Sequence, residues 1–206
     1  MAQLAYVPTA GANASMWWGE LTPDQRPADA FSLVFDTEPL LEPLQILGFP
    51  SVELSGAVDA PLAHFFGRLC DVAPDGATTL VTGGGINGAQ RDSDEEPASL
   101  EPGRRYDLSF QLHFTSWVFP AGHRIRLSVS NAMFPMIWPT PYPMTLTLAI
   151  GQGAATRLTL PVLPGPGRDG TSGSREVHPP PSERPGHAGR LHCLGLDAPE
   201  HVGRRS

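Results

Sequence analysis

Apolar and polar residues alternate one by one along much of the chain between residues 31 and 163. Such alternation is typical of β-strands that bury one face. The longest example spans residues 106–115, with apolar side chains at Tyr106, Leu108, Phe110, Leu112 and Phe114. No stretch has a helical period long enough for a core helix. The pattern therefore predicts an all-β protein with an antiparallel β-sandwich.

The turn residues divide the pattern into about eight short strands. We expect them near residues 31–35, 45–54, 64–72, 78–82, 106–115, 123–130, 144–150 and 157–162. The strand at 64–72 is apolar on both faces, so it should be central in its sheet. After it, Pro74 and Gly76 supply the backbone angles of a tight turn.

Three regions follow from the same pattern. Residues 1–30 are rich in Pro and Gly and should form a loop-rich segment packed on the sandwich. Residues 31–163 should form the sandwich itself. Residues 164–206 are dense in Pro, Gly, Arg and His without apolar periodicity, which predicts a disordered tail.

Charge and cysteine content limit the class of protein. The net charge of −7 argues against nucleic-acid binding, which needs a basic face. Cys70 lies in an apolar strand and Cys193 in the tail, so no disulfide framework is expected. The first residues do not resemble a signal peptide, and no apolar run is long enough to span a membrane. A cytoplasmic protein without membrane contact is the expectation.

Three sequence strings, taken together and in order, carry a family resemblance: RLCDVAPDG, EPGRRY and PAGHRIRLSVS. They resemble the C-terminal β-sandwich of the CocE/NonD serine hydrolases, over about residues 15–163. The resemblance implies a jelly roll of galactose-binding-like type. It also implies that the partner is an α/β-hydrolase catalytic domain and that the complete enzyme hydrolyses esters or X-Pro dipeptides. The chain is then expected to be a detached accessory domain, either a split subunit or a truncated product.

Catalytic residues of that family cannot be placed on this sequence. Its enzymes use a serine on a G-x-S-x-G turn, and no such string occurs here. We therefore expect the chain to be inactive alone, although its family consists of hydrolases. A new site built on His64, His113 or His123 is the alternative, but strand and turn histidines are the simpler interpretation.

No cofactor or metal is expected. Residues 83–88 match G-x-G-x-x-G, but the dinucleotide fingerprint needs a helix directly after the glycines, and AQRDSDEEP cannot supply one. These glycines more simply mark a bulge or a close backbone approach. The acidic cluster Asp92, Asp94, Glu95 and Glu96 lacks calcium-loop spacing. The histidines and cysteine of the tail fit no zinc module.

The remaining candidates are five large aromatic residues in Pro/Gly-rich segments: Trp17, Trp18, Phe134, Trp138 and Tyr142. They could simply cover the ends of the sandwich, since large aromatics are mostly buried. The alternative is that they contact the catalytic domain or line its substrate pocket. Without that domain, their exposed surface could lead to self-association. In a stand-alone sugar-binding or ligand-binding module, the same tryptophans would be the binding platform.

Overall fold

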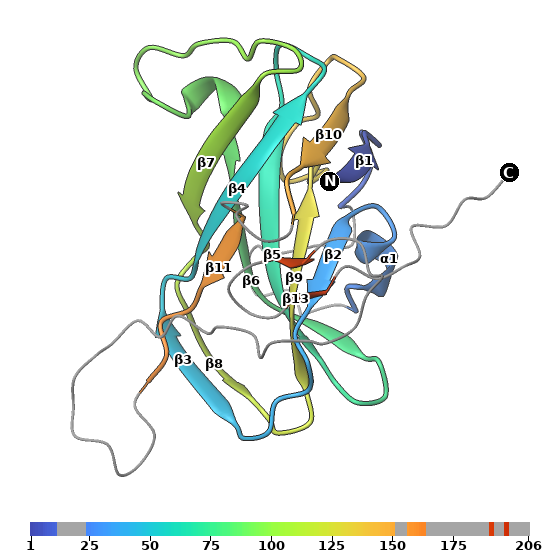
Figure 1. Cartoon of the computed structure of the whole chain (residues 1–206), viewed down its shortest axis with the longest axis vertical. Helices are drawn as coiled ribbons and strands as arrows, with labels where there is room; N and C mark the ends of the chain where they lie inside the picture. The colour runs from blue at the N-terminus through green and yellow to red at the C-terminus, as the bar shows by residue number, and fades with distance from the viewer. Residues whose placement is uncertain (12–23, 151–155, 164–189, 192–195, 198–206) are drawn as a thin grey trace, which may run out of the picture.

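The computed structural model describes residues 1–11, 24–150, 156–163, 190–191 and 196–197. Two antiparallel sheets pack face to face, and a two-stranded ribbon lies at one end of them (Figure 1). Apart from a four-residue helix and one short 3₁₀ turn, the regular elements are strands. The nearly all-β antiparallel sandwich predicted from the alternation is confirmed.

The first sheet is organised around β4 (Ser51–Val58). One edge of β4 pairs with β7 (Arg105–Gln111). Its other edge pairs with β10 (Thr145–Leu148) and with β11 (Arg157–Thr159), at different ends of β4. The first strand of the chain, β1 (Ala2–Ala5), extends this sheet beyond β10. The N-terminal segment, expected to be loop-rich, thus also supplies an edge strand.

The second sheet is organised around β5 (His64–Val72), which lies between β6 (Thr78–Asn87) and β9 (Arg124–Ser130). The predicted central position of this strand is confirmed. Beyond β9 the sheet continues through β2 (Leu33–Asp36). Within the region expected to be a disordered tail, the structure describes β13 (Leu196–Asp197), paired with β2, and β12 (Arg190–Leu191), paired with β13. Most of that region, including Cys193, lies outside the described residues.

The core lies between the two sheets. From β9, Ile125, Leu127 and Val129 point inward and are at most 1% exposed. The facing strand β4 contributes Val52 and Leu54, which are equally buried. The apolar half of each alternating pattern therefore forms the core, as expected from the sequence.

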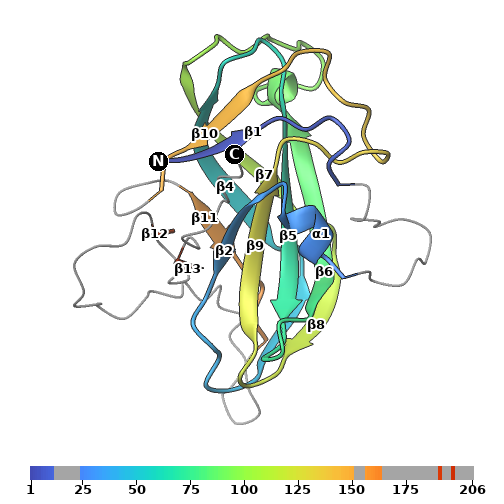
Figure 2. The same ribbon diagram turned by 90° about the vertical axis from the view of Figure 1, so that its right-hand side faces the viewer.

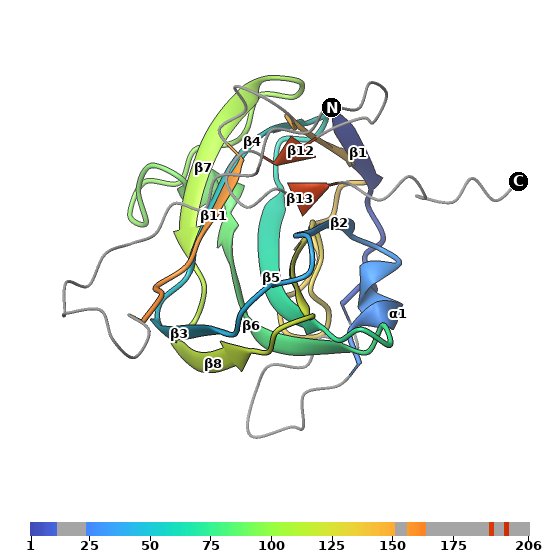
Figure 3. The same ribbon diagram turned by 60° about the horizontal axis from the view of Figure 1, so that its bottom comes forward.

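The predicted bounds were wrong for two strands, because each predicted range covers parts of two separate strands. The strand expected at 45–54 is divided into β3 (Leu44–Gly48) and β4 by Phe49 and Pro50, since Gly48 has a φ of 136°. The strand expected at 106–115 ends at Gln111, and β8 (Thr115–Phe119) begins four residues later. The two additional pieces, β3 and β8, pair with each other as the ribbon (Figure 3). Phe114, placed on the core face by the pattern, is 57% exposed at the resulting break.

The outer face of the second sheet carries the helix α1 (Arg26–Asp29), which lies over β5 and β9 (Figure 2). Pro27 fits near its start, where no hydrogen-bond donor is needed. The helix is too short to be stable alone, so its position depends on contacts with the sheet.

The glycine run at 83–88 belongs to β6 and to the 3₁₀ turn η1 (Gly88–Gln90). A Cβ on Gly84 would lie 2.7 Å from the carbonyl oxygen of Gln111, which belongs to the other sheet. A Cβ on Gly85 would lie 2.6 Å from the carbonyl oxygen of Phe65. The close backbone approach predicted for these glycines is confirmed. It brings the end of β7 against β6, where His113 N–H donates to the oxygen of Gly83 at 3.0 Å.

Candidate functional site

Three of the five predicted aromatic residues lie on the loop that joins β9 to β10, residues 131–144, which we name the aromatic loop. Trp138 is 81% exposed, Tyr142 is 42% exposed and Phe134 is partly buried. The rings of Phe134 and Trp138 meet edge to face with centroids 6.3 Å apart. Trp17 and Trp18 lie outside the described residues. The aromatic loop therefore combines an exposed tryptophan with a partly buried aromatic support.

The backbone of the aromatic loop is held to the N-terminal segment. Phe134 N–H donates to the oxygen of Ala10 at 3.0 Å, and the Tyr6 hydroxyl donates to the oxygen of Thr140 at 3.0 Å. Met133, near the start of the loop, is only 4% exposed. These contacts fix the loop on both sides of Trp138, so the exposed ring projects from an ordered backbone.

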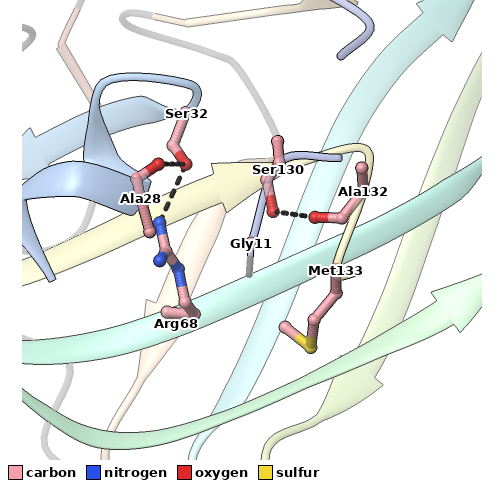
Figure 4. Close-up of a pocket in the computed structure, with 8 residues that line it drawn as sticks. Gly11, Ala28, Ser32, Arg68, Ser130, Ala132 and Met133 are labelled. Carbon is pink, nitrogen blue, oxygen red and sulfur yellow. Dashed lines mark hydrogen bonds between the residues drawn. The ribbon is translucent and has the colours of Figure 1, made fainter. Parts of the chain in front are cut away.

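A small pocket lies beneath the start of this loop (Figure 4). Arg68, Ser32, Ser130 and Met133 are among its lining residues. The pocket is too narrow to hold a water molecule. The pocket is consequently a small gap in the packing between the loop and the sheet, and it has no room for a ligand.

The helix α1 is fixed to the sheet by a buried arginine. Arg68 on β5 is 1% exposed and donates to three side chains of the helix region. The acceptors are Gln25 Oε1 at 3.1 Å, Asp29 Oδ1 at 3.0 Å and Ser32 Oγ at 2.8 Å. A buried charge is tolerated only when it is paired in this way.

A second arginine completes the network. Arg126 on β9 contacts both oxygens of Asp36, at 2.6 and 2.7 Å, and Asp29 Oδ2 at 3.0 Å. Burial lowers the pKa of Arg126, but the hydrogen bonds and charges of Asp36 and Asp29 outweigh it and raise that pKa overall. Because two arginines face two carboxylates, the network has no net charge and serves to fix α1 to the sheet.

The three histidines occupy different environments. His123 Nδ1 lies 2.7 Å from Asp71 Oδ1, while Trp117 Nε1 donates to the other oxygen of Asp71 at 3.0 Å. This group joins β8 to β5. His64 is partly buried, and burial lowers its pKa. His113 is exposed. The three histidines are thus dispersed over the sandwich, as expected for strand and turn residues.

The sequence analysis missed one group of exposed apolar residues, because it assigned Leu47, Phe49 and Phe114 to strands with a buried face and left Val118 outside the predicted strands. Leu47 and Val118 lie on the ribbon, Phe49 and Phe114 lie directly beside it in the sequence, and all four are about half exposed. The available signal was the glycine and proline at 48 and 50, which break the strand pattern there.

The described part of the chain offers few other groups that could bind a metal or react. No group of three or more His, Cys, Asp or Glu side chains gathers there to hold a metal ion. Cys70 is a fully buried free thiol, and burial raises its pKa to about 12. No helix among the described residues is long and apolar enough to cross a membrane.

Comparison with known proteins places the chain in a family of non-catalytic domains. Residues 3–161 match the family described as the X-Pro dipeptidyl-peptidase C-terminal non-catalytic domain. Cocaine esterase of Rhodococcus sp. is 33% identical over 132 residues, which is 63% of this chain and 23% of the esterase.

Solved structures resemble the chain over a similar share of its length. An α-amino acid ester hydrolase superposes with a TM-score of 0.71 and 25% identity, covering 79% of this chain and 32% of the hydrolase. An aminopeptidase from a Thaumarchaeota archaeon gives a TM-score of 0.70 at 21% identity, covering 79% and 33%.

These matches define a non-catalytic accessory sandwich of a multidomain hydrolase. The chain belongs to the X-Pro dipeptidyl-peptidase C-terminal domain family and corresponds to the C-terminal domain of the CocE/NonD hydrolases. It spans about a quarter to a third of the length of the relatives it matches. In the full-length enzymes such a domain is attached to a catalytic hydrolase domain.

Proposed function

We propose that the aromatic loop is the surface through which this domain contacts an α/β-hydrolase catalytic domain, and that it forms part of the wall of the substrate pocket. In this proposal the complete enzyme hydrolyses esters or X-Pro dipeptides, and this domain contributes shape but no catalytic group. Trp17 and Trp18 are proposed to belong to the same surface.

The observation that carries the proposal is Trp138, which is 81% exposed on a backbone held by hydrogen bonds. A large apolar ring in water is unfavourable, and exposed apolar patches on ordered surfaces commonly mark interaction sites. The outer face of the first sheet is different, since it carries charged residues such as Glu53, Arg105 and Asp107. A charged face of this kind is stable in contact with water and does not need a partner to cover it.

A sugar-binding module is the second candidate, because Trp138 and Tyr142 could also stack on a pyranose ring. Galactose-binding-like ancestry would agree with that use. The two candidates differ in the partner: a sugar should bind the isolated chain, whereas the docking function needs a protein domain. Calorimetry with a panel of oligosaccharides separates them.

The test of the docking proposal uses the catalytic domain of cocaine esterase expressed without its own C-terminal part. We expect this chain to bind that domain in a surface-binding assay. Trp138→Ser should weaken the binding at least about tenfold, because buried tryptophans are typical hot spots of interfaces. Leu41→Ser is the matched control, since Leu41 is a 95% exposed apolar residue outside the aromatic loop.

Equal binding by the wild type and Trp138→Ser would exclude the aromatic loop as the docking surface. A reducing, cytoplasmic location is part of the proposal, because the buried free thiol of Cys70 is compatible with such a compartment. Fractionation of the source cells would check it.

A further inference from the structure

The second half of the aromatic loop, residues 138–143, is held by very few hydrogen bonds. Proline occupies every second position from 139 to 143, and proline has no N–H to donate. Within the described residues, a single hydrogen bond reaches this stretch: the Tyr6 hydroxyl donates to the oxygen of Thr140 at 3.0 Å. The position of the stretch therefore depends on one side chain of the N-terminal segment.

The first half of the loop, residues 131–137, is held more firmly. Phe134 N–H donates to the oxygen of Ala10 at 3.0 Å, and Met133 is buried. The backbone of Gly11 approaches so closely that a Cβ there would lie 2.8 Å from Met133 Cα. The first half is therefore packed against the N-terminal segment, whereas the second half is joined to it by one side-chain contact.

Tyr6 is itself anchored independently of that contact. Beyond β1 the chain runs past the aromatic loop (Figure 2), and the backbone N–H of Tyr6 donates to the oxygen of Met144 at 3.0 Å. The Tyr6 side chain also packs against the core. Loss of the hydroxyl bond would therefore release residues 138–143 between two fixed ends and leave Tyr6 in place.

The arrangement seen in the structure also carries a cost within the loop. Thr140 Oγ1 and Asn131 Nδ2 are buried and have no hydrogen-bond partner in the described part of the chain, and Asn131 is 2% exposed. Buried polar groups without partners are rare and destabilising, because they have given up their bonds to water. A displacement of residues 138–143 would hydrate the Thr140 hydroxyl and remove part of this cost.

We propose that Tyr6 and Thr140 form a latch with two states, and that this latch controls the position of Trp138. In the closed state, which the structure shows, the hydroxyl bond is made and Trp138 lies edge to face on Phe134. In the open state the bond is broken, the Thr140 hydroxyl is in water and Trp138 has left Phe134. A partner that binds one state better shifts the balance toward that state.

The latch is a property of the isolated chain. Its consequence for binding rests on the docking function proposed above. A catalytic domain that binds the closed loop would hold the latch shut, and the closed fraction of the free chain would scale the observed affinity. The latch can be measured without any partner, so the two proposals can fail separately.

Fluorine NMR of the full chain labelled with 5-fluorotryptophan tests the latch. Trp138→Phe identifies the Trp138 signal, whose shift depends on the neighbouring Phe134 ring. Tyr6→Phe removes the latch hydroxyl and should shift the ratio of closed to open chain toward open by about three- to tenfold, the effect of one hydrogen bond. Thr140→Val removes the unpartnered hydroxyl at nearly constant shape and should shift the ratio toward closed by about threefold or more.

Tyr142→Phe is the matched control, because it removes a tyrosine hydroxyl from the same stretch without touching the latch. It should leave the ratio of closed to open chain unchanged. The double variant Tyr6→Phe with Thr140→Val should recover part of the closed population. The melting temperature of each variant should stay within about 4 °C of the wild type, because the latch involves one loop outside the core.

A Trp138 signal that is identical in the wild type, Tyr6→Phe and Thr140→Val would overturn the latch. A larger open fraction in Thr140→Val would also overturn it, because the hydroxyl would then have a partner in the closed state, such as an ordered water. A much larger fall in the melting temperature of Tyr6→Phe would show that Tyr6 holds the whole fold instead of one loop.

Binding to the catalytic domain of cocaine esterase tests the consequence for docking. Tyr6→Phe should bind more weakly than the wild type and Thr140→Val more tightly, each by the factor by which its closed fraction changes in the NMR measurement. Equal affinities despite different closed fractions would overturn the link between the latch and docking. Absence of binding by all three proteins would contradict the docking function, while the NMR result would still decide the latch.

Discussion

Along β7, buried and exposed side chains alternate from one residue to the next. Phe110 lies opposite Val52 of β4 and is 8% exposed, while its neighbour Gln111 faces outward. A shift of one position along the strand would exchange these two environments.

Truncation of Phe110 should therefore reveal the register. Phe110→Ala should lower the free energy of unfolding by about 3–5 kcal/mol, because it removes buried area and leaves a cavity. Gln111→Ala should leave that free energy nearly unchanged. Urea unfolding of the two variants is the measurement, and similar values for both would contradict the assigned register.

The reactivity of Cys70 should likewise report its burial. Because the pKa of this thiol is raised to about 12, almost none of it is thiolate at pH 8. In a Cys193→Ser variant we expect no reaction with a thiol-directed disulfide reagent in the native state and full reaction in guanidinium. Rapid native labelling would mean that β5 opens readily.

At the scale of elements, α1 depends on charged partners more than on its own length. Its four residues cannot form a stable helix alone, and Asp29 connects it to Arg68 and Arg126 in the sheet below. Asp29 is therefore the carboxylate that the two arginines share, while Arg126 has Asp36 as a second partner.

Asp29→Asn should destabilise the fold by roughly 3–5 kcal/mol, because it removes the charge that compensates buried Arg68. The control is Asp24→Asn, which removes an exposed partner of Arg26 and should change the melting temperature little. Thermal unfolding followed by circular dichroism measures both. Equal melting temperatures for the two variants would mean that the network does not hold α1.

From the sequence, β9 could be predicted by its uninterrupted alternation and β5 by its apolar residues on both faces. The pattern was misleading at Gly48 and at Leu112, because alternation continues while the chain passes from a sheet to the ribbon. Phe114 was misplaced for the same reason. The Asp29 network was not predictable, since Asp29 and its partner Arg126 lie 97 residues apart in the sequence.

At the scale of the whole molecule, the described chain is a scaffold with two exposed apolar surfaces at its ends. The aromatic loop was identified from the sequence because its aromatics lie between strands. The exposure of Trp138 could not be deduced, since it depends on how Tyr6 and Ala10 hold the loop.

The purified chain should not hydrolyse p-nitrophenyl esters or an X-Pro anilide. Its sequence lacks the G-x-S-x-G nucleophile turn, and Asp71 and His123 are used to join β8 to β5. Initial rates against a buffer blank are the measurement. Turnover that disappears when one serine of this chain is replaced would contradict the expectation.

The contact between β6 and the end of β7 also limits how this domain can evolve. A single methyl group at Gly84 would meet the backbone of the other sheet, and one at Gly85 would meet the backbone of its neighbouring strand. Neither obstacle can be relieved by rotating a side chain. In a library that samples every substitution, these two positions should therefore accept almost nothing, whereas surface positions on β7 such as Gln111 should accept many residues.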